Sequence, residues 1–140
     1  MRVMVTGGAG FIGSHVVDRF VEAGHEVVVV DDLSSGRESN LNPKAKFVRL
    51  DLRDPDLARV CEAERPEIVD HHAAQIDVRK SIENPVEDAE INILGSLRLI
   101  DFAVKNKVQK FSLFISKKPL WLIPAIVSRF KLSARQKRPG

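Results

Sequence analysis

The chain of 140 residues has no tyrosine, so no phenol is available to it for proton transfer. Cysteine is almost as rare, because Cys61 is the only one, and this excludes a disulfide within the chain. A chain without disulfides fits a reducing compartment, from which we expect a cytoplasmic location. Long apolar runs are also missing, since no stretch approaches the roughly 20 residues needed to cross a bilayer.

Acidic residues are absent from the last part of the chain. Residues 1–116 hold all 19 acidic residues and 15 of the 22 basic ones, which gives this part a net charge of −4. Residues 117–140 hold the other seven basic residues. Such a change of composition predicts a folded domain at 1–116 and a basic tail at 117–140. The N-terminus leads directly into an apolar run, and we therefore expect no signal peptide.

A glycine cluster ends the first apolar run of the sequence. Residues 3–6 are apolar or β-branched, the glycines follow, and an apolar helical pattern begins at Phe11. This order predicts a buried strand, a tight turn and a helix start, which together form a cradle for a phosphate group. Gly7 would make the turn, Gly10 would let the backbone approach a pyrophosphate, and Gly13 would let the helix pack on the strand.

Asp31 ends the next apolar run and follows Gly13 by 18 positions. A carboxylate at this spacing can accept hydrogen bonds from the ribose hydroxyls of an adenine dinucleotide. It would also repel a 2′-phosphate, so the sequence favours NAD over NADP. Arg37 in the following loop argues weakly the other way, although a loop arginine is usually solvated.

The rest of the sequence up to residue 115 alternates between strand and helix patterns. Asp54 and Pro55 predict the start of a helix, as its cap and its first helical residue. Asn84 and Pro85 predict the start of a longer one. This alternation is typical of a doubly wound α/β fold with a parallel sheet. The predicted strands are 2–6, 26–31, 46–50, 68–71 and 110–115, and the predicted helices are 11–23, 54–64 and 84–106.

Two of these helices carry apolar faces. In the helix at 11–23, helical spacing places Phe11, Ile12 and Val17 on the inner face with other apolar residues. The helix at 84–106 is apolar over a wider arc, which indicates burial against the sheet and against a further partner.

Two adjacent histidines, His71 and His72, stand at the end of the fourth predicted strand. Neighbours on a strand point to opposite faces, so these two cannot easily form one pair of metal ligands, and we expect no metal site. The small residues Ala73 and Ala74 follow, and they would let a cofactor lie close to the backbone.

The strongest signals are the segments Thr6–His15, Asp31–Gly36, Asp51–Leu52, His71–Gln75 and Asn92–Ser96. Together they resemble the UDP-glucose 4-epimerases and related nucleotide-sugar epimerases of the NAD-dependent epimerase/dehydratase family, which are extended short-chain dehydrogenases/reductases. The resemblance extends to about residue 111. It implies a Rossmann-type doubly wound sheet that is incomplete here and is followed by an irregular tail.

The resemblance implies a role in binding NAD for each part of the site. The glycine loop and helix start would hold the pyrophosphate, and the loop from Asp31 would hold the adenosine ribose. Asp51 and Leu52 would flank the adenine, with the carboxylate accepting from the exocyclic amine. The segment after the fourth strand would run towards the nicotinamide. The implied residues are Gly7, Gly10, Phe11, Ile12, Gly13, Asp31, Asp32, Leu33, Ser34, Ser35, Gly36, Asp51, Leu52, His72, Ala73, Ala74 and Gln75.

In the family that the sequence resembles, a tyrosine of a Tyr-x-x-x-Lys motif takes the proton of the sugar 4-hydroxyl while NAD takes the C4 hydride. This sequence has no tyrosine and lacks the sugar-binding C-terminal domain, so we expect no catalytic residue and no turnover. It would be the NAD-binding N-terminal portion of such an epimerase. The resemblance further implies a homodimer through helices near 75–82 and 85–106.

The tail has competing interpretations. Residues 117–140 follow no clear period, and a shifted reading frame near 111–113 would recover the family's pattern, so we expect a frameshift product. Its apolar and basic residues could instead form a membrane-surface segment or a nucleic-acid arm, but we expect neither a membrane nor a nucleic acid as partner. The alternative for the whole chain is a non-catalytic dinucleotide-sensing or interaction module whose basic tail contacts a partner or a membrane surface.

Overall fold

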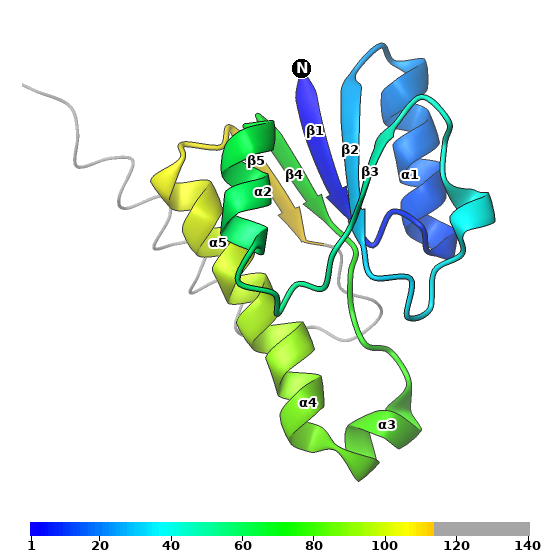
Figure 1. Ribbon diagram of the computed structural model, residues 1–140, viewed down its shortest axis with the longest axis vertical. Helices are drawn as coiled ribbons and strands as arrows, with labels where there is room; N and C mark the ends of the chain where they lie inside the picture. Colours follow the sequence, from blue (N-terminus) through cyan, green and yellow to red (C-terminus); the bar gives the residue numbers. More distant parts are fainter. Residues whose placement is uncertain (114–140) are drawn as a thin grey trace, which may run out of the picture.

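A parallel sheet of five strands forms the centre of the molecule (Figure 1). The computed structural model describes residues 1–113. The strands lie in the order β3-β2-β1-β4-β5, so the chain fills one half of the sheet and then the other. This order and the parallel pairing confirm the Rossmann-type doubly wound α/β fold. The strands are β1 (Arg2–Thr6), β2 (Glu26–Asp31), β3 (Lys46–Arg49), β4 (Ile68–His71) and β5 (Lys110–Leu113).

Helices cover both faces of the sheet. One face carries α1 (Phe11–Glu22), and the other carries α2 (Leu57–Glu64) and α5 (Ser96–Lys105) (Figure 1). Beyond the edge at which the strands end, α3 and α4 project away from the sheet. No helix within residues 1–113 is long and apolar enough to span a membrane. The remaining segments are the 3₁₀ turn η1 (Glu38–Asn40), α3 (Val78–Glu83), α4 (Pro85–Ala89) and the π-helical segment η2 (Glu90–Gly95).

The alternation of side chains along β1 divides the core into two parts. Val3 and Val5 pack on the α1 side with Val17, whereas Met4 packs on the other side with Leu99 of α5. All five side chains are buried. A central parallel strand has both faces covered, which explains why the first two strands are apolar almost throughout.

The strand predictions agree closely with the structure, but one helix start was wrong. β1, β2 and β4 have the predicted bounds, and β3 ends one residue early. The helix predicted at 54–64 begins only at Leu57. Asp54 accepts a hydrogen bond from the N–H of Asp56 at 2.8 Å, so it stabilises a turn ahead of α2 and is not its cap. Residues 114–115 of the last predicted strand, the boundary at 116 and the tail at 117–140 lie outside the described residues.

The helix predicted at 84–106 is a continuous helical stretch with an irregular middle. Asn84 caps α4, since its side chain accepts a hydrogen bond from the N–H of Glu87 at 3.2 Å. The π-helical segment η2 then adds a wider turn before α5 begins at Ser96. The sequence did not predict this turn, because one wider turn hardly alters an apolar pattern that is already broad.

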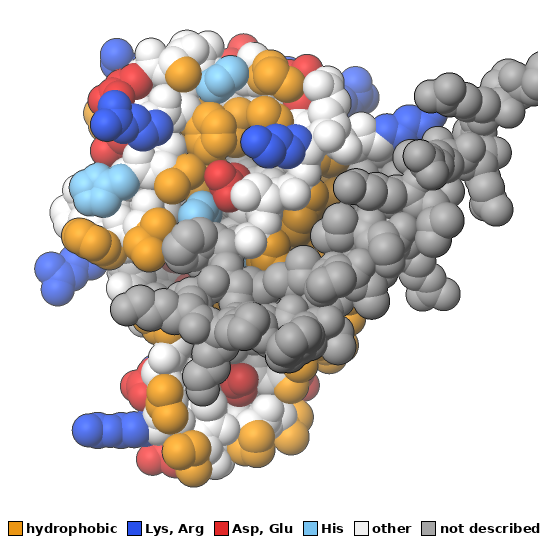
Figure 2. All heavy atoms as spheres, turned by 180° about the vertical axis from the view of Figure 1, so that it is seen from behind, with side chains coloured by type: hydrophobic (Ala, Val, Ile, Leu, Met, Phe, Trp, Pro, Cys, Tyr) orange, Lys and Arg blue, Asp and Glu red, His pale blue; other side chains and the backbone are white. Residues whose placement is uncertain are grey.

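The part formed by α3, α4 and η2 exposes apolar side chains. Leu99 of α5 is fully buried against the sheet, but the projecting segments have no such cover within residues 1–113. Figure 2 shows hydrophobic side chains on this projecting part of the molecule. We call them the projecting apolar surface. Its residues are Ile76, Val78, Ile82, Val86, Ile93 and Leu94, which are between 46% and 78% exposed.

Candidate functional site

The ends of β1 to β4 bring most of the predicted site residues to one edge of the sheet (Figure 1). Parallel strands end at the same edge, and the chain leaves each of them there in a loop. The strand order reverses between β1 and β4. In a doubly wound sheet such a switch point is the place where ligands bind, and the loops after β1 and β4 flank it.

The loop between β1 and α1 is a tight turn that depends on glycine. Gly7 has a left-handed φ of 72°, and a Cβ atom there would lie 2.5 Å from the backbone nitrogen of Ala73. A Cβ at Gly13 would collide with the carbonyl group of Gly7. At Gly10 a Cβ would meet only the carbonyl oxygen of Gly7, at 3.2 Å, so the space beside it is otherwise open.

The first turn of α1 is suited to meet an anion. Gly10 is the N-cap, no side chain caps the helix, and the first turn has no acidic residue. The N–H groups of this turn have no partner within the helix and form the positive end of its dipole. Phe11 and Ile12 are 80% and 47% exposed, so the prediction that they face inward was wrong. The first turn lies at the edge of the sheet, ahead of the face against which Val17 packs.

Asp31 connects β2 to the glycine loop. Its buried carboxylate accepts a hydrogen bond from the N–H of Ala9 at 3.0 Å and another from the N–H of Leu33 at 2.8 Å. These two bonds use different oxygens, and a carboxylate has about four acceptor sites. Each oxygen of Asp31 therefore keeps capacity for a ligand hydroxyl, at the position that the sequence predicted.

The loop after Asp31 folds back onto Ala9. The carbonyl oxygen of Ala9 accepts hydrogen bonds from the N–H of Arg37 at 3.1 Å and from the side chain of Asn40 at 2.9 Å. Gly36 packs on the same residue, since a Cβ there would lie 2.8 Å from that of Ala9. The loop predicted to bind the ribose is thus fixed to the glycine loop predicted to bind the phosphates.

Polar residues of this loop hold its local shape. Asp32 accepts hydrogen bonds from the N–H and the hydroxyl of Ser34, at 2.8 and 2.6 Å. Leu33 between them has a left-handed φ of 62°. Ser34 and Ser35 are exposed to solvent.

Asp51 and Leu52 follow β3 but differ in what they offer to a ligand. The carboxylate of Asp51 pairs with Arg53, whose Nη2 lies 2.6 Å from Oδ2. The hydrogen bond to this guanidinium is the main reason that the pKa of Asp51 is lowered. Leu52 is 5% exposed and packs in the core beside Gly95. Its side chain is not available to flank a base, which leaves only its backbone for the predicted role.

The segment after β4 passes close to the glycine loop. Ala73 is the residue that a side chain at Gly7 would strike. His72 precedes it, with Nε2 lying 3.0 Å from Oδ1 of Asp70. Ala74 is exposed. The structure therefore brings these residues to the switch point together with the glycine loop.

Gln75 is held by η2 and α3. The side chain of Asn92 accepts a hydrogen bond from the N–H of Gln75 at 2.8 Å and donates one to its carbonyl oxygen at 2.9 Å. The side chain of Gln75 donates to the carbonyl oxygen of Asp77 at 2.9 Å. Its side-chain amide therefore stabilises the start of α3, which leaves only its backbone for the predicted role.

His71 lies in a buried chain of hydrogen bonds. Its Nδ1 is 2.6 Å from the hydroxyl of Thr6, and its Nε2 is 2.8 Å from the hydroxyl of Ser96. Ser96 donates to the carbonyl oxygen of Asn92, so it accepts from Nε2–H and leaves Nδ1 to accept from Thr6. Burial, and to a smaller extent the neighbouring His72, lowers the pKa of His71 to about 4. The neutral ring links β1 to the start of α5.

The segment Asn92–Ser96 was among the sequence signals, but sequence reasoning assigned its residues no role in supporting the site. Asn92 and Ser96 are four positions apart, which places them on one side of a helix, but nothing local shows that this side meets His71. Ala9 contributes through its backbone, which leaves no signal in the residue type. Arg53 stands two positions after Asp51, and this short spacing in the sequence could have suggested that the two side chains form an ion pair.

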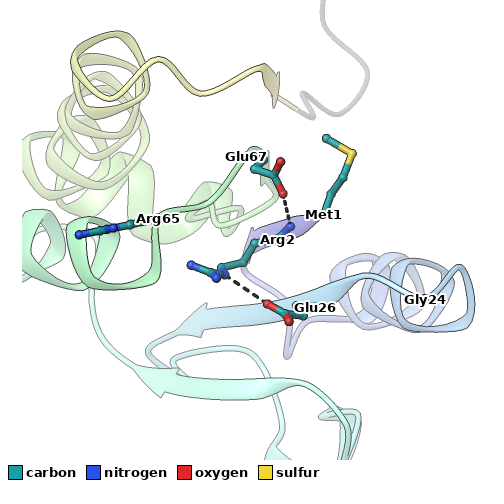
Figure 3. Close-up of a pocket in the computed structure, with 6 residues that line it drawn as sticks. All are labelled: Met1, Arg2, Gly24, Glu26, Arg65 and Glu67. Carbon is teal, nitrogen blue, oxygen red and sulfur yellow. Dashed lines mark hydrogen bonds and ion pairs between the residues drawn. The ribbon is translucent and has the colours of Figure 1, made fainter.

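A pocket of about 370 Å³ lies at the opposite edge of the sheet (Figure 3). The N–H of Arg2 donates to the carboxylate of Glu67 at 2.8 Å, and its Nε lies 3.3 Å from the carboxylate of Glu26. Arg2 and the two carboxylates therefore pair with one another at the starts of the strands, far from the glycine loop. The pocket is lined by Met1, Arg2, Gly24, Glu26, Arg65 and Glu67.

Among residues 1–113 no group of three His, Cys, Asp or Glu side chains is placed to hold a metal ion.

Residues 3–118 match the model of the NAD dependent epimerase/dehydratase family. The chain belongs to this family. A curated relative, the UDP-glucose 4-epimerase of Mycolicibacterium smegmatis, is 46% identical over 115 residues. The match covers 79% of this chain and 37% of the relative, so the chain spans little more than a third of the relative's length.

Solved structures of UDP-glucose 4-epimerases share the fold of this member of the epimerase/dehydratase family. The enzyme of Thermotoga maritima with UDP-glucose is 48% identical, with a TM-score of 0.78 over 81% of this chain and 37% of that chain. The enzyme of Thermus thermophilus in complex with NAD is 46% identical, with a TM-score of 0.75 over 79% of this chain and 36% of that chain.

Proposed function

We propose that the chain is the NAD-binding N-terminal portion of a 4-epimerase that acts on UDP-glucose and UDP-galactose. The observation that carries the proposal is the hydrogen bond between the Asp31 carboxylate and the N–H of Ala9 in the glycine loop. It sets a ribose acceptor beside a phosphate cradle, which is the arrangement that a dinucleotide needs. The family match and the NAD complex of the Thermus thermophilus epimerase support it.

Each part of the proposed crevice offers groups that suit one part of NAD. The closed glycine turn and the uncapped start of α1 would bind the pyrophosphate through backbone N–H groups. Asp31 keeps acceptor capacity for the ribose hydroxyls and would repel a 2′-phosphate. Phe11 and Ile12, exposed beside the loop, would be covered by the bound dinucleotide. The same proposal includes Gly7, Gly10, Gly13, Asp32, Leu33, Ser34, Ser35, Gly36, Asp51, His72, Ala73 and Ala74, and Leu52 and Gln75 through their backbone.

We also propose that this chain has no catalytic activity. NAD, when bound, supplies the acceptor for a hydride, and the residues of this crevice would bind and orient it. None of the 140 residues is a tyrosine that could take the proton of a sugar hydroxyl. The cytoplasmic location expected from the single cysteine stays a prediction.

Replacement of Asp31 tests the cofactor assignment. The unmodified chain is expected to bind NAD more tightly than NADP in calorimetry. Asp31→Asn should weaken NAD binding about tenfold or more, because hydrogen bonds to a charged acceptor contribute roughly 1.5–3 kcal/mol. It should also narrow the preference for NAD, because the repulsion of a 2′-phosphate is lost.

A matched control removes the same charge away from the crevice. Asp101→Asn on α5 breaks only an exposed ion pair with Lys105, so both affinities should stay as they are. Tighter binding of NADP than of NAD by the unmodified chain would overturn the ribose assignment.

We further propose a homodimer through the helical segments near 75–82 and 85–106. Support comes from the projecting apolar surface, whose side chains lie on these segments of the chain and are exposed. A contiguous apolar surface on a small protein is typical of an interaction site.

The projecting apolar surface also favours a second candidate, a non-catalytic module that senses dinucleotides or contacts a partner. The two candidates differ in what the coding DNA contains downstream. An epimerase C-terminal half in a shifted frame would support the first candidate and the frameshift origin of residues 117–140. Its absence would support the second.

A further inference from the structure

Asn92 joins the segment after β4 to the helices that carry the projecting apolar surface. Its side chain accepts a hydrogen bond from the N–H of Gln75 at 2.8 Å and donates one to the carbonyl oxygen of the same residue at 2.9 Å. One side chain of η2 therefore holds both polar backbone groups of Gln75. A displacement of η2 must move the segment 72–75 with it or break both bonds.

The projecting apolar surface begins directly at this junction. Ile76 follows Gln75 in the chain and is 78% exposed. Ile93 and Leu94 follow Asn92 in η2 and belong to the same surface. The two residues that bond to each other thus each stand immediately before residues of the projecting apolar surface, and no linker separates this surface from the segment 72–75.

Asp88 of α4 extends the junction to α3 and α4. Its Oδ1 accepts hydrogen bonds from the side chain of Asn92 at 3.2 Å and from the hydroxyl of Ser81 at 2.7 Å. The side chain of Gln75 donates to the same hydroxyl at 3.2 Å. One network of polar side chains therefore ties α3, α4 and η2 to one another and to the segment after β4, and such a network responds as a unit.

We propose that Asn92 couples dinucleotide binding to dimerisation, so that bound NAD strengthens the homodimer. The proposal rests on the proposed function and on the proposed homodimer, because it concerns the regulation of the same site. NAD would order the segment 72–75, along which its nicotinamide half would lie. A second copy of the chain on the projecting apolar surface would order α3 and η2. Both events fix the bonds between Gln75 and Asn92, so whichever comes first lowers the entropy cost of the other.

Analytical ultracentrifugation of the full chain with and without ligand tests this coupling. Saturating NAD should lower the dissociation constant of the dimer about tenfold, which is within the usual range of coupling between two sites. ADP is the matched ligand, because it has the adenosine and the two phosphates but no nicotinamide half to lie along 72–75. Saturating ADP should leave the dissociation constant of the dimer unchanged.

Substitutions at Asn92 should remove the effect of NAD on the dimer. Asn92→Ala loses both bonds to Gln75, so NAD should then change the dissociation constant of the dimer by about twofold or less. Asn92→Ser, whose hydroxyl is too short to reach both backbone groups, should act in the same direction and serves if the first variant does not fold. Asn106→Ala is the matched control, because the side chain of Asn106 donates to the carbonyl oxygen of Phe102 at the end of α5. It should keep the full effect of NAD.

The affinity for NAD gives an independent measurement, because coupling between two binding events is reciprocal. Ile82 lies on the projecting apolar surface and is 77% exposed. Ile82→Glu would hold the chain monomeric, and calorimetry should then find NAD binding about threefold weaker than in the unmodified dimer, since the two sites of a dimer share the tenfold change.

The outcomes separate this inference from the proposals beneath it. A dissociation constant of the dimer that NAD leaves unchanged, or that NAD and ADP lower equally, would overturn the coupling even if NAD binds and the dimer forms. A tenfold effect of NAD that persists in both Asn92 variants would overturn the role of Asn92. A chain that binds no NAD would instead refute the proposed function, and a chain that stays monomeric would refute the proposed homodimer, in each case with this inference.

Discussion

Two buried polar side chains connect the loops of the site. Asp31 bonds to the glycine loop through Ala9, and His71 bonds to Thr6 immediately before that loop. Removing one partner of a buried hydrogen bond leaves the other unsatisfied, at a cost of roughly 1–3 kcal/mol. The position of the glycine loop therefore depends on the last residues of β2 and β4.

Gly13→Ala is expected to destabilise the chain and to weaken NAD binding. Its Cβ would collide with the carbonyl group of Gly7, so the helix must move away from the loop. A crowding of this kind typically costs about 1–3 kcal/mol. Chemical denaturation and calorimetry would measure the two effects.

Gly24→Ala is the matched control for this prediction. Gly24 has a φ of 80°, but a Cβ there would meet nothing within 4 Å. The substitution should cost only the backbone term of about 1–2 kcal/mol and leave NAD affinity unchanged. Equal losses of NAD affinity in both variants would contradict the steric explanation.

His71 should make the stability of the chain depend on pH. Its folded-state pKa of about 4 lies below the ordinary value of 6.5, so the unfolded chain binds the proton first as pH falls. Stability is then lost between about pH 6.5 and pH 4, by about 3 kcal/mol in total. Denaturation of His71→Gln across this range should show a flatter profile. The same slope in the variant would show that other groups cause the dependence.

The sequence predicted the local structure around the glycine loop and Asp31 better than the contacts of their neighbours. Glycines and a carboxylate at fixed spacing are constrained by local geometry, so Gly7, Gly13 and Asp31 could be placed from the sequence alone. The burial of the Leu52 side chain depends on which helical segment packs above β3. Such contacts come from tertiary structure and leave no pattern in the chain.

At the scale of elements, α3 and α4 carry apolar side chains that stay exposed within residues 1–113. Ile82 of α3 is 77% exposed. Ile82→Glu should shift the chain from dimer to monomer in analytical ultracentrifugation, because a charge would have to lose its water in the interface. Ala63→Glu adds the same charge on the exposed side of α2 and should leave the dimer intact. A monomeric unmodified chain would contradict the proposed homodimer.

The elements differed in how well they could be predicted. Strands bounded by glycine or charged residues, such as β1 and β2, had clear ends in the sequence. The start of α2 was misplaced because Asp54 and Pro55 suit a turn as well as a helix start. The π-helical segment η2 could not be seen, because its wider turn is set by packing and not by residue type.

At the scale of the whole molecule, the chain spans about 37% of the Mycolicibacterium smegmatis relative. Purified chain should therefore show no interconversion of UDP-glucose and UDP-galactose above background, since no tyrosine is present to move the proton. A coupled assay for the second sugar would measure this. Turnover that copurifies with the chain and falls in Asp31→Asn would contradict the proposal of an inactive chain.

The π-helical segment η2 also sets the angle between two surfaces of the molecule. Each residue of an α-helix advances by about 100° around the axis, so one added residue turns all that precedes it by that angle relative to all that follows. Deleting a residue from Glu90–Gly95 would swing α4 around the axis while α5 stayed against the sheet. The direction in which the projecting apolar surface points is thus encoded by the length of η2, and a change of one residue there would redirect this surface while the sheet stayed the same.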